Sequence, residues 1–575
     1  MIGTTQWTRY RLACALLAAL KLATAAGATD YTNVATSGAW DTNTTWTPNT
    51  SYPQLSGDTA TILSNVVTLV GGTYVIPAIQ RIELAASGGK TGTLYFAANV
   101  GQSAPLQLNG GILKLDHTYP YGCLVSNSLT VKSGSQIYAV GNNNGGVYSG
   151  NDIYGSIQDW VQGATTNTGK IRVTGDSNKG CILLRGAGSA FSGGWDIAGG
   201  SAYPGFIVGG NGTRPVGGVV VYSDGGLGSG TATVHTTLRV WSNQSGTPAV
   251  PPPTMIVVQP LYDMAGVWLG EDDFHGVFSV TNWNMDYYGG ALVFSDDASS
   301  FSGGVLNAYS NMTFTAKRDN RWAGLSRYGG EIRGSGRITI NPYWFSGLYG
   351  NASSAFYLSG NSTNFTGGVT LLGNNLYLQH TNALGRTGDC WFAAGDAGAV
   401  YLQNAAGAVN WTLGNNLGGV NTVQVENASA SYTLTLPGTT LQPGTNINAS
   451  GKLTVAGNLA FGTNAVGGAS TWIVDVTGTN GVAGVDFDQL VVTHSLTNLN
   501  NATLVVNVAT NLAKDALAGQ ELIVATNATA LASGFVSVSF GGAWHGKVAY
   551  NQPTGTVKLY QVSAQPISGT VLFVQ

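Results

Sequence analysis

The sequence predicts an all-β protein, an elongated right-handed parallel β-helix (β-solenoid) with a small distal β region. Short strand-like runs recur along the chain, and each is bounded by Gly, Asn or Asp. The chain has 575 residues, whereas a single hydrophobic core usually stops growing at roughly 250–300 residues. A repeat architecture resolves this conflict because it adds core as it adds length.

Composition agrees with this fold class. Hydrophobic residues make up 43% of the chain and charged residues only 9%, against about 25% charged residues in an average soluble domain. The chain can therefore build a core, and its 83 glycines suit tight turns between strands. The 24 basic and 27 acidic residues form no basic cluster, so we expect no nucleic-acid partner.

Strand signals dominate the chain and helical signals are almost absent. The apolar runs have four to seven residues and are rich in Val and Leu, as at 60–63, 65–70, 218–222, 369–372, 375–378, 490–493 and 502–508. Such runs are typical of stacked short strands.

A tetrapeptide repeat indicates the solenoid. Phe191, Phe301 and Phe365 each begin a Phe-Ser/Thr-Gly-Gly motif that opens a β-like run. Their separations of 110 and 64 residues approximate multiples of 21–22 residues, a length suited to one coil of a β-helix. We expect the Phe rings to stack in the core, and the Gly-Gly pairs to adopt the positive φ angles of a sharp corner.

The segment 359–371, Ser-Gly-Asn-Ser-Thr-Asn-Phe-Thr-Gly-Gly-Val-Thr-Leu, closes at Ala383-Leu-Gly385. It resembles the repeat of bacterial proteins with autotransporter-associated β-strand repeats. The segments 38–62 and 487–493 also look similar to such passenger-like proteins. The resemblance implies a β-helical passenger architecture more firmly than it implies an activity.

We expect the following organisation. Residues 1–28 resemble a signal peptide, with Arg9 and Arg11 before an apolar stretch and small residues before the cleavage point. Residues 29–116 would form an N-terminal capping region, 117–455 the main solenoid with an insertion around 203–290, and 456–575 a C-terminal β region. We expect no transmembrane segment after signal removal, and a secreted or outer cell-surface protein.

Removal of a signal peptide would leave Cys123, Cys181 and Cys390. This odd, widely spaced set is a poor disulfide framework and a poor metal site. We expect three small buried side chains, with a Cys123–Cys181 bridge as the alternative.

An acidic cluster is the strongest catalytic or metal candidate. Asp273 and Asp296 would lie about one coil apart and Arg318 about one coil further, as an acid/base constellation for a polysaccharide lyase or hydrolase. Glu271, Asp273 and Asp296 would be the ligands of Ca²⁺ if a cofactor is needed; otherwise we expect no cofactor. The simpler interpretation is a solvated, charged loop.

Aromatic residues concentrate in the same third of the chain. Exposed rings would bind sugars by stacking, and the candidates are Trp268, Trp283, Tyr287, Trp322 and Trp344. The alternative is that these rings fill the core. Any ligand site is therefore expected within 262–345.

The sequence favours an exported structural or adhesive solenoid without catalytic activity, whose partner is a cell-surface polysaccharide or another copy of itself. The alternative function is a polysaccharide-active enzyme or carbohydrate-binding protein that uses residues 262–345.

Overall fold

A computed structural model describes residues 28–564 with internal gaps. The residues outside the described part are 1–27, 35–36, 71–73, 77–78, 98–99, 117–122, 141–150, 176–181, 187–189, 200–217, 222–225, 241–254, 262–264, 270–276, 295–297, 318–324, 344–354, 374, 393–397, 445–447, 552 and 565–575. The chain divides into two compact units. Unit 1 is Met1–Tyr203 with Pro215–Gly230, and unit 2 is Pro204–Arg214 with Thr231–Gln575.

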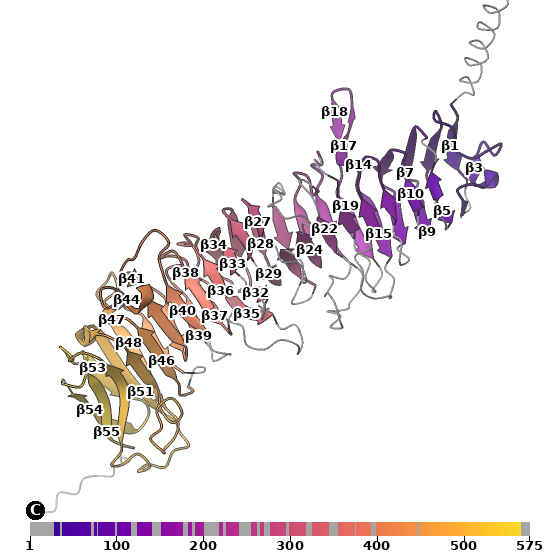
Figure 1. The fold of residues 1–575 in the computed structure, drawn as a ribbon. Helices are drawn as coiled ribbons and strands as arrows, with labels where there is room; N and C mark the ends of the chain where they lie inside the picture. Colours follow the sequence, from indigo (N-terminus) through magenta and orange to yellow (C-terminus); the bar gives the residue numbers. More distant parts are fainter. Residues whose placement is uncertain are drawn as a thin grey trace, which may run out of the picture. The chain divides into compact units, whose positions relative to one another are not determined.

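The described strands of unit 1 fall into three sheets (Figure 1). Sheet 1a contains, in spatial order, β18 (Thr165–Asn167), β17 (Ile157–Gln162), β14 (Leu129–Ser133), β11 (Leu106–Asn109), β7 (Arg81–Ser87), β4 (Thr59–Ile62), β1 (Asp30–Asn33) and β3 (Trp46–Thr47), with β8 (Lys90–Thr91) paired to β7. Sheet 1b contains β2 (Gly38–Ala39), β5 (Val66–Val70), β9 (Thr93–Ala97), β12 (Ile112–Asp116), β15 (Ser135–Val140), β19 (Ile171–Gly175) and β21 (Trp195–Ile197). Sheet 1c contains β6 (Tyr74–Ile76), β10 (Val100–Gln102), β13 (Leu124–Val125), β16 (Asn151–Ile153), β20 (Ile182–Leu184) and β22 (Val219–Val221).

Successive strands along the unit 1 chain visit the three sheets in turn, so three strands make one coil. Each strand then pairs in parallel with its counterpart one coil later, as β9 does with β12 and β12 with β15. Side chains on a strand alternate between its two faces. The inward positions therefore form columns, and the column on sheet 1b is buried throughout: Leu94, Leu113, Ile137, Val173 and Ile197.

Two tryptophans pack at the start of unit 1. The rings of Trp40 and Trp46 are buried and meet edge to face, with centroids 5.0 Å apart. The indole N–H of Trp46 donates to the carbonyl of Trp40 at 2.8 Å. Both tryptophans of the segment 38–62 thus lie in the core beside the first strands.

The described strands of unit 2 fall into four sheets. Sheet 2a contains β23 (Ala232–Val234), β25 (Ile256–Val258), β28 (Met285–Tyr287), β31 (Val305–Ala308) and β34 (Glu331–Gly334). Sheet 2b contains β24 (Thr237–Val240), β26 (Gly266–Leu269), β29 (Ala291–Phe294), β32 (Met312–Lys317), β35 (Ile338–Tyr343), β37 (Val369–Leu371), β39 (Asp389–Phe392), β42 (Asn416–Gly419), β45 (Thr440–Pro443), β48 (Ser470–Val476), β51 (Ala502–Val508) and β53 (Ser537–Phe540). Sheet 2c contains β27 (Val277–Thr281), β30 (Ala298–Ser302), β33 (Leu325–Tyr328), β36 (Ala355–Leu358), β38 (Asn375–Leu378), β40 (Ala399–Leu402), β43 (Thr422–Val425), β46 (Lys452–Ala456), β49 (Gln489–Val492), β52 (Glu521–Asn527), β55 (Thr556–Ala564) and β54 (Trp544–Asn551). Sheet 2d contains β41 (Trp411–Thr412), β44 (Thr433–Pro437), β47 (Asn458–Gly462) and β50 (Leu496–Thr497).

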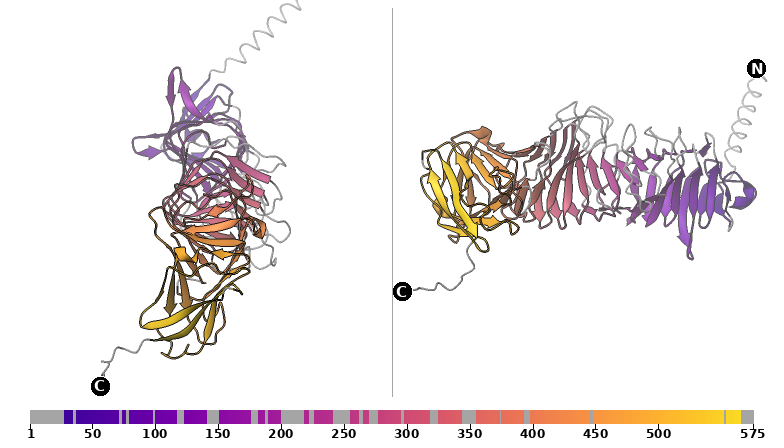
Figure 2. Two further views of the ribbon diagram at one scale, coloured as in Figure 1. Left: turned by 90° about the vertical axis from the view of Figure 1, so that its left-hand side faces the viewer. Right: turned by 90° about the horizontal axis from the view of Figure 1, so that it is seen from below.

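Unit 2 repeats the same design, and Figure 2 shows its strands as successive layers. The inward column of sheet 2c is Leu376, Val400, Val423, Val455 and Val492, each buried and in register with the next. The last strands differ, because β55 pairs antiparallel with both β52 and β54. The predicted parallel β-helix with a small distal β region is confirmed.

For the tetrapeptide motif, burial of the Phe ring is confirmed, and positive φ at both glycines is confirmed for one of the three copies. Phe191, Phe301 and Phe365 are buried, and each motif has a glycine with positive φ: 80° at Gly194, 70° and 75° at Gly303 and Gly304, and 76° at Gly368. The three copies do not all take the same place. Phe301 lies in β30 and its motif leads into β31 of sheet 2a, whereas Phe365 bridges to Gly334 and its motif leads into β37 of sheet 2b.

The predicted constant period of 21–22 residues is wrong. The in-register pair Asp286 and Asn307 is 21 residues apart, but the in-register pair Asp475 and Asn507 is 32 residues apart. Strand pairing fixes the register of each coil, while the connections between strands lengthen outside the core without disturbing it.

The predicted limits at 116/117 and 455/456 coincide with no change in strand pairing. Strand β12 pairs in parallel with β15, and β46 pairs in parallel with β49. The limits of the two compact units lie at 203/204, 214/215 and 230/231, and the insertion around 203–290 stays a prediction. Residues 1–27 of the predicted signal peptide lie outside the described part.

Buried carboxylates hold the distal coils of unit 2 together. Oε1 of Glu426 accepts the indole N–H of Trp411 at 2.8 Å and two backbone N–H groups at 3.2 Å. Asp488 is fully buried, and its two oxygens accept backbone N–H groups of Gly451 and Asp475 at 2.7 and 2.8 Å. Burial raises the pKa of Asp488 to about 8.

The described residues contain three short 3₁₀ helices, η1 (Asn43–Thr45), η2 (Glu426–Ala428) and η3 (Leu499–Asn501). None of the helices among these residues could cross a membrane. Cys123 and Cys390 are buried, as predicted, and Cys181 lies outside the described part.

Candidate functional site

Most of the sequence-predicted site residues lie outside the described part of the chain. These residues are Glu271, Asp273, Asp296, Arg318, Trp322 and Trp344. The acidic constellation and the Ca²⁺ site therefore stay predictions. Among the residues that the structure does describe, no group of three or more His, Cys, Asp or Glu could hold a metal ion.

The three described aromatic candidates do not form an exposed platform. Trp268, Trp283 and Tyr287 are 3%, 1% and 0% exposed. The Trp283 ring packs edge to face on Phe301, with centroids 6.3 Å apart, and burial raises the pKa of Tyr287. The interpretation of these three as sugar-stacking residues is wrong, because all three side chains are buried and present no ring to solvent.

A groove lies elsewhere, on the outer face of sheet 2b. It crosses four strands that neighbour one another in the sheet, β37, β39, β42 and β45, and ends at Arg337 directly before β35; its volume is about 570 Å³. We name it the Trp391 groove. Its lining residues are Arg337, Thr370, Asp389, Cys390, Trp391, Asn416, Leu417, Gly418, Thr440 and Gln442.

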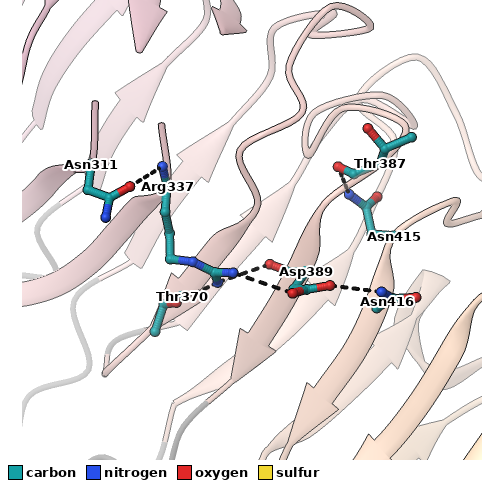
Figure 3. A network of polar contacts seen from close by, with 7 residues as sticks. All are labelled: Asn311, Arg337, Thr370, Thr387, Asp389, Asn415 and Asn416. Carbon is teal, nitrogen blue, oxygen red and sulfur yellow. Dashed lines mark hydrogen bonds and ion pairs between the residues drawn. The ribbon is translucent and has the colours of Figure 1, made fainter. Parts of the chain in front are cut away.

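A row of polar side chains, drawn in Figure 3, forms part of the lining of the Trp391 groove. The Arg337 guanidinium donates to Oγ1 of Thr370 at 3.0 Å and to the Asp389 carbonyl at 3.2 Å, and lies 3.6 Å from the Asp389 carboxylate. Asn416 donates to the other carboxylate oxygen of Asp389 at 2.8 Å and accepts the backbone N–H of Thr440 at 2.8 Å. The row thus connects residues from five coils.

Strand register explains this row. The ladder places Arg337, Gly368, Asp389, Asn416 and Thr440 at equivalent positions of successive coils. Because Gly368 has no side chain, the long Arg337 side chain can pass over the coil that contains Gly368 and reach Asp389. The outward positions alternate with buried inward ones such as Cys390 and Leu417.

Trp391 lies in the middle of the groove. It is partly exposed and in register with Thr370 on one neighbouring strand and Gly418 on the other. Its benzo ring occupies the space over Gly418, where any side chain would overlap Cζ3 and Cε3. The absence of a side chain at position 418 therefore lets the indole lean across the sheet.

The groove presents no net charge and no carboxylate pair. Among its lining residues, Asp389 is the only acid and Arg337 the only base, and they form an ion pair with side chains 58% and 33% exposed. Glycosidases use two carboxylates that flank the scissile bond. The lining residues offer hydrogen-bond donors, acceptors and one aromatic surface, which is the chemistry of binding.

An aromatic ladder lies on the outer face of sheet 2c. The rings of Tyr357, Tyr377 and Tyr401 stack with centroids 4.6 and 4.3 Å apart and interplanar angles of 16° and 8°. The Arg327 guanidinium lies 4.6 Å from the centroid of Tyr357. The ring faces cover one another, so this ladder joins coils and offers a ligand mainly ring edges.

Sequence reasoning missed both the groove and the ladder. Arg337, Trp391 and Asn416 stand in different coils, and the unequal coil lengths conceal that they share one face. The alternating pattern of each strand could have placed them outward, but only strand register shows which coils are neighbours.

Comparisons with known proteins give little for this chain. No family model and no curated protein matches it. Among solved structures it is similar to the Hap adhesin of Haemophilus influenzae, with 12% sequence identity and a TM-score of 0.20. The match covers 89% of this chain, and the chain spans 65% of the length of that adhesin.

Proposed function

We propose that the protein is an exported structural or adhesive β-solenoid, displayed at the cell surface or released from it, that works by binding and not by turnover. The observation that carries the proposal is the Trp391 groove, a surface without net charge that is assembled from five coils. The passenger-like repeats and the predicted signal peptide support export.

The outward polar side chains favour a structural scaffold. Many of them bond to the neighbouring coil: Asn307 donates to Asp286 at 2.7 Å, and Asn109 donates to Glu83 at 2.8 Å. Gln442 and Asn507 donate to the two oxygens of Asp475 at 2.9 and 3.0 Å. These bonds tie strand to strand and fix the coil register, as a stiff surface scaffold requires.

The test has two parts. Antibody labelling of intact cells that express the full chain reports export, and beads coated with purified chain report adhesion to cells and to polysaccharide films. We expect surface labelling and bead retention. A chain that stays inside the cell, or beads that bind no surface, would overturn the proposal.

The alternative of a polysaccharide-active enzyme with a site in 262–345 stays a prediction. Incubation of the same purified chain with polysaccharides, followed by a reducing-sugar assay, tests it directly. Release of new reducing ends that Asp273→Ala abolishes would replace the non-catalytic proposal with the enzymatic one.

A further inference from the structure

We propose that the Trp391 groove is a binding site for a neutral, extended β-linked polysaccharide, which lies along the groove with a sugar ring against Trp391. This proposal deepens the adhesive role and rests on it. It names the ligand class, and it places the site on sheet 2b, outside most of the 262–345 region that the sequence suggested.

The direction of the groove favours an extended chain. Its lining residues are Arg337, directly before β35, and residues of β37, β39, β42 and β45, which follow one another across the sheet. Neighbouring strands lie about 4.8 Å apart, and an extended β-1,4-linked hexose chain advances by a comparable length per sugar. Equivalent positions of successive coils can therefore meet successive sugars.

The polar row favours hydroxyl groups as the ligand atoms. Arg337, Asp389 and Asn416 hold one another in place through hydrogen bonds of 2.8–3.2 Å and an ion pair of 3.6 Å. The Asp389 side chain is nevertheless 58% exposed, so its oxygens can accept further bonds. Rigid, prearranged donors and acceptors suit sugar hydroxyls, which both donate and accept.

Charge balance favours a neutral ligand. The ion pair between Arg337 and Asp389 leaves no uncompensated charge among the lining residues. An anionic glycan would have to compete with Asp389 for the guanidinium and would approach the carboxylate itself. A neutral glycan meets neither cost.

The aromatic surface supplies the apolar contact. Trp391 lines the groove between Thr370 and Gly418, and the C–H face of a hexose ring packs well on an indole. The φ angle of Gly418 is not in the left-handed region. The atoms nearest to a Cβ placed at this position belong to the Trp391 indole. A side chain at position 418 would therefore displace the indole without straining the backbone.

The test is affinity electrophoresis of the purified full chain in gels that contain hydroxyethylcellulose, dextran or polygalacturonate. We expect retardation by the β-linked neutral polymer alone. This retardation should not change between about 0.05 and 0.5 M NaCl, because a neutral polymer forms no ion pair with the protein. We expect Trp391→Ala to weaken binding by about tenfold or more, and Trp391→Tyr to retain part of it.

Two further variants separate the site from the fold. Gly418→Ala keeps the tryptophan but moves it, and we expect weaker binding with an unchanged melting temperature. Tyr377→Ala is the matched control, since it removes an aromatic side chain from sheet 2c of the same unit, and we expect binding equal to the unmodified chain.

Wild-type affinity in both Trp391→Ala and Gly418→Ala would overturn the site. Retardation by polygalacturonate that is lost at high salt would overturn the neutral ligand class. Equal binding of dextran and hydroxyethylcellulose would overturn the extended β-linked ligand class. Beads that adhere to cells while the chain binds none of these polymers would overturn the glycan proposal and leave the adhesive role standing. Polymer binding without any adhesion or surface display would overturn the adhesive role and leave the glycan site standing.

Discussion

Phe301→Ala tests the core stacking that holds the coils of unit 2 together. The Phe301 side chain is 2% exposed. Its ring centroid lies 5.8 Å from Phe294, 6.0 Å from Tyr328 and 6.3 Å from Trp283. Truncation of a buried Phe to Ala costs about 3–5 kcal/mol, and the lost aromatic pairs place this site toward the upper end. We therefore expect the free energy of unfolding of unit 2 to fall by about 4 kcal/mol.

The assay is urea-induced unfolding of the full chain, followed by tryptophan fluorescence and far-ultraviolet circular dichroism. Tyr309→Ala is the matched control, because Tyr309 is 49% exposed and stacks on the exposed Tyr288 at 5.0 Å. We expect the control to cost less than about 1 kcal/mol. If Phe301→Ala unfolds at the same urea concentration as the control, Phe301 does not pack in the core and the stacking is wrong.

Three further predictions concern buried polar groups. Burial raises the pKa of Asp488 to about 8, above an unfolded value near 3.9. The stability that Asp488 contributes is therefore fully present below about pH 4 and is lost as pH rises through about 8. In thermal melts, the melting temperature of Asp488→Asn should fall less steeply with pH than that of the unmodified chain, and an equal fall would contradict this. Glu426→Ala leaves the Trp411 indole and two backbone N–H groups without their acceptor. The buried indole donor should cost about 1–3 kcal/mol, and the two part-buried backbone donors should cost less. Urea unfolding measures the loss, and Glu426→Gln should lose less. Burial raises the pKa of Cys390 to about 12, so mass spectrometry should find this thiol unmodified by iodoacetamide in the native chain and modified in urea, whereas modification of the native chain would contradict its burial.

The fold class followed from the sequence because the inward positions of a β-helix are chemically uniform. The run 490–493 is apolar except for Thr493, and the structure buries Leu490 and Val492 on one face of β49 as expected. The role of the Phe-Ser/Thr-Gly-Gly motif was also predictable, since glycine tolerates positive φ and a large apolar ring avoids water. Coil length was not predictable, because connections of different length leave the same strands in register.

The groove was not predictable for the same reason. Asp389 and Asn416 are ordinary polar residues in the sequence, and they become a site only when the register brings them beside Arg337. The concentration of Trp and Tyr near 262–345 pointed instead to residues such as Trp283 and Tyr287, which the coil encloses. Aromatic density alone does not separate core from surface, since both use the same rings.

The in-register parallel stacking of coils carries the fold and assembles the groove, and engineered disulfides test it most directly. Adjacent parallel strands lie about 4.8 Å apart, within the Cα separation that a disulfide accepts, whereas strands two coils apart do not. Tyr377 and Tyr401 are in-register partners on β38 and β40, and Tyr357 lies one strand before Tyr377. We predict that Tyr377→Cys with Tyr401→Cys forms a disulfide on mild oxidation, detected by peptide mass spectrometry, and that Tyr357→Cys with Tyr401→Cys does not. Equal bridging of both pairs, or bridging of the second pair alone, would contradict the solenoid register and the groove built on it.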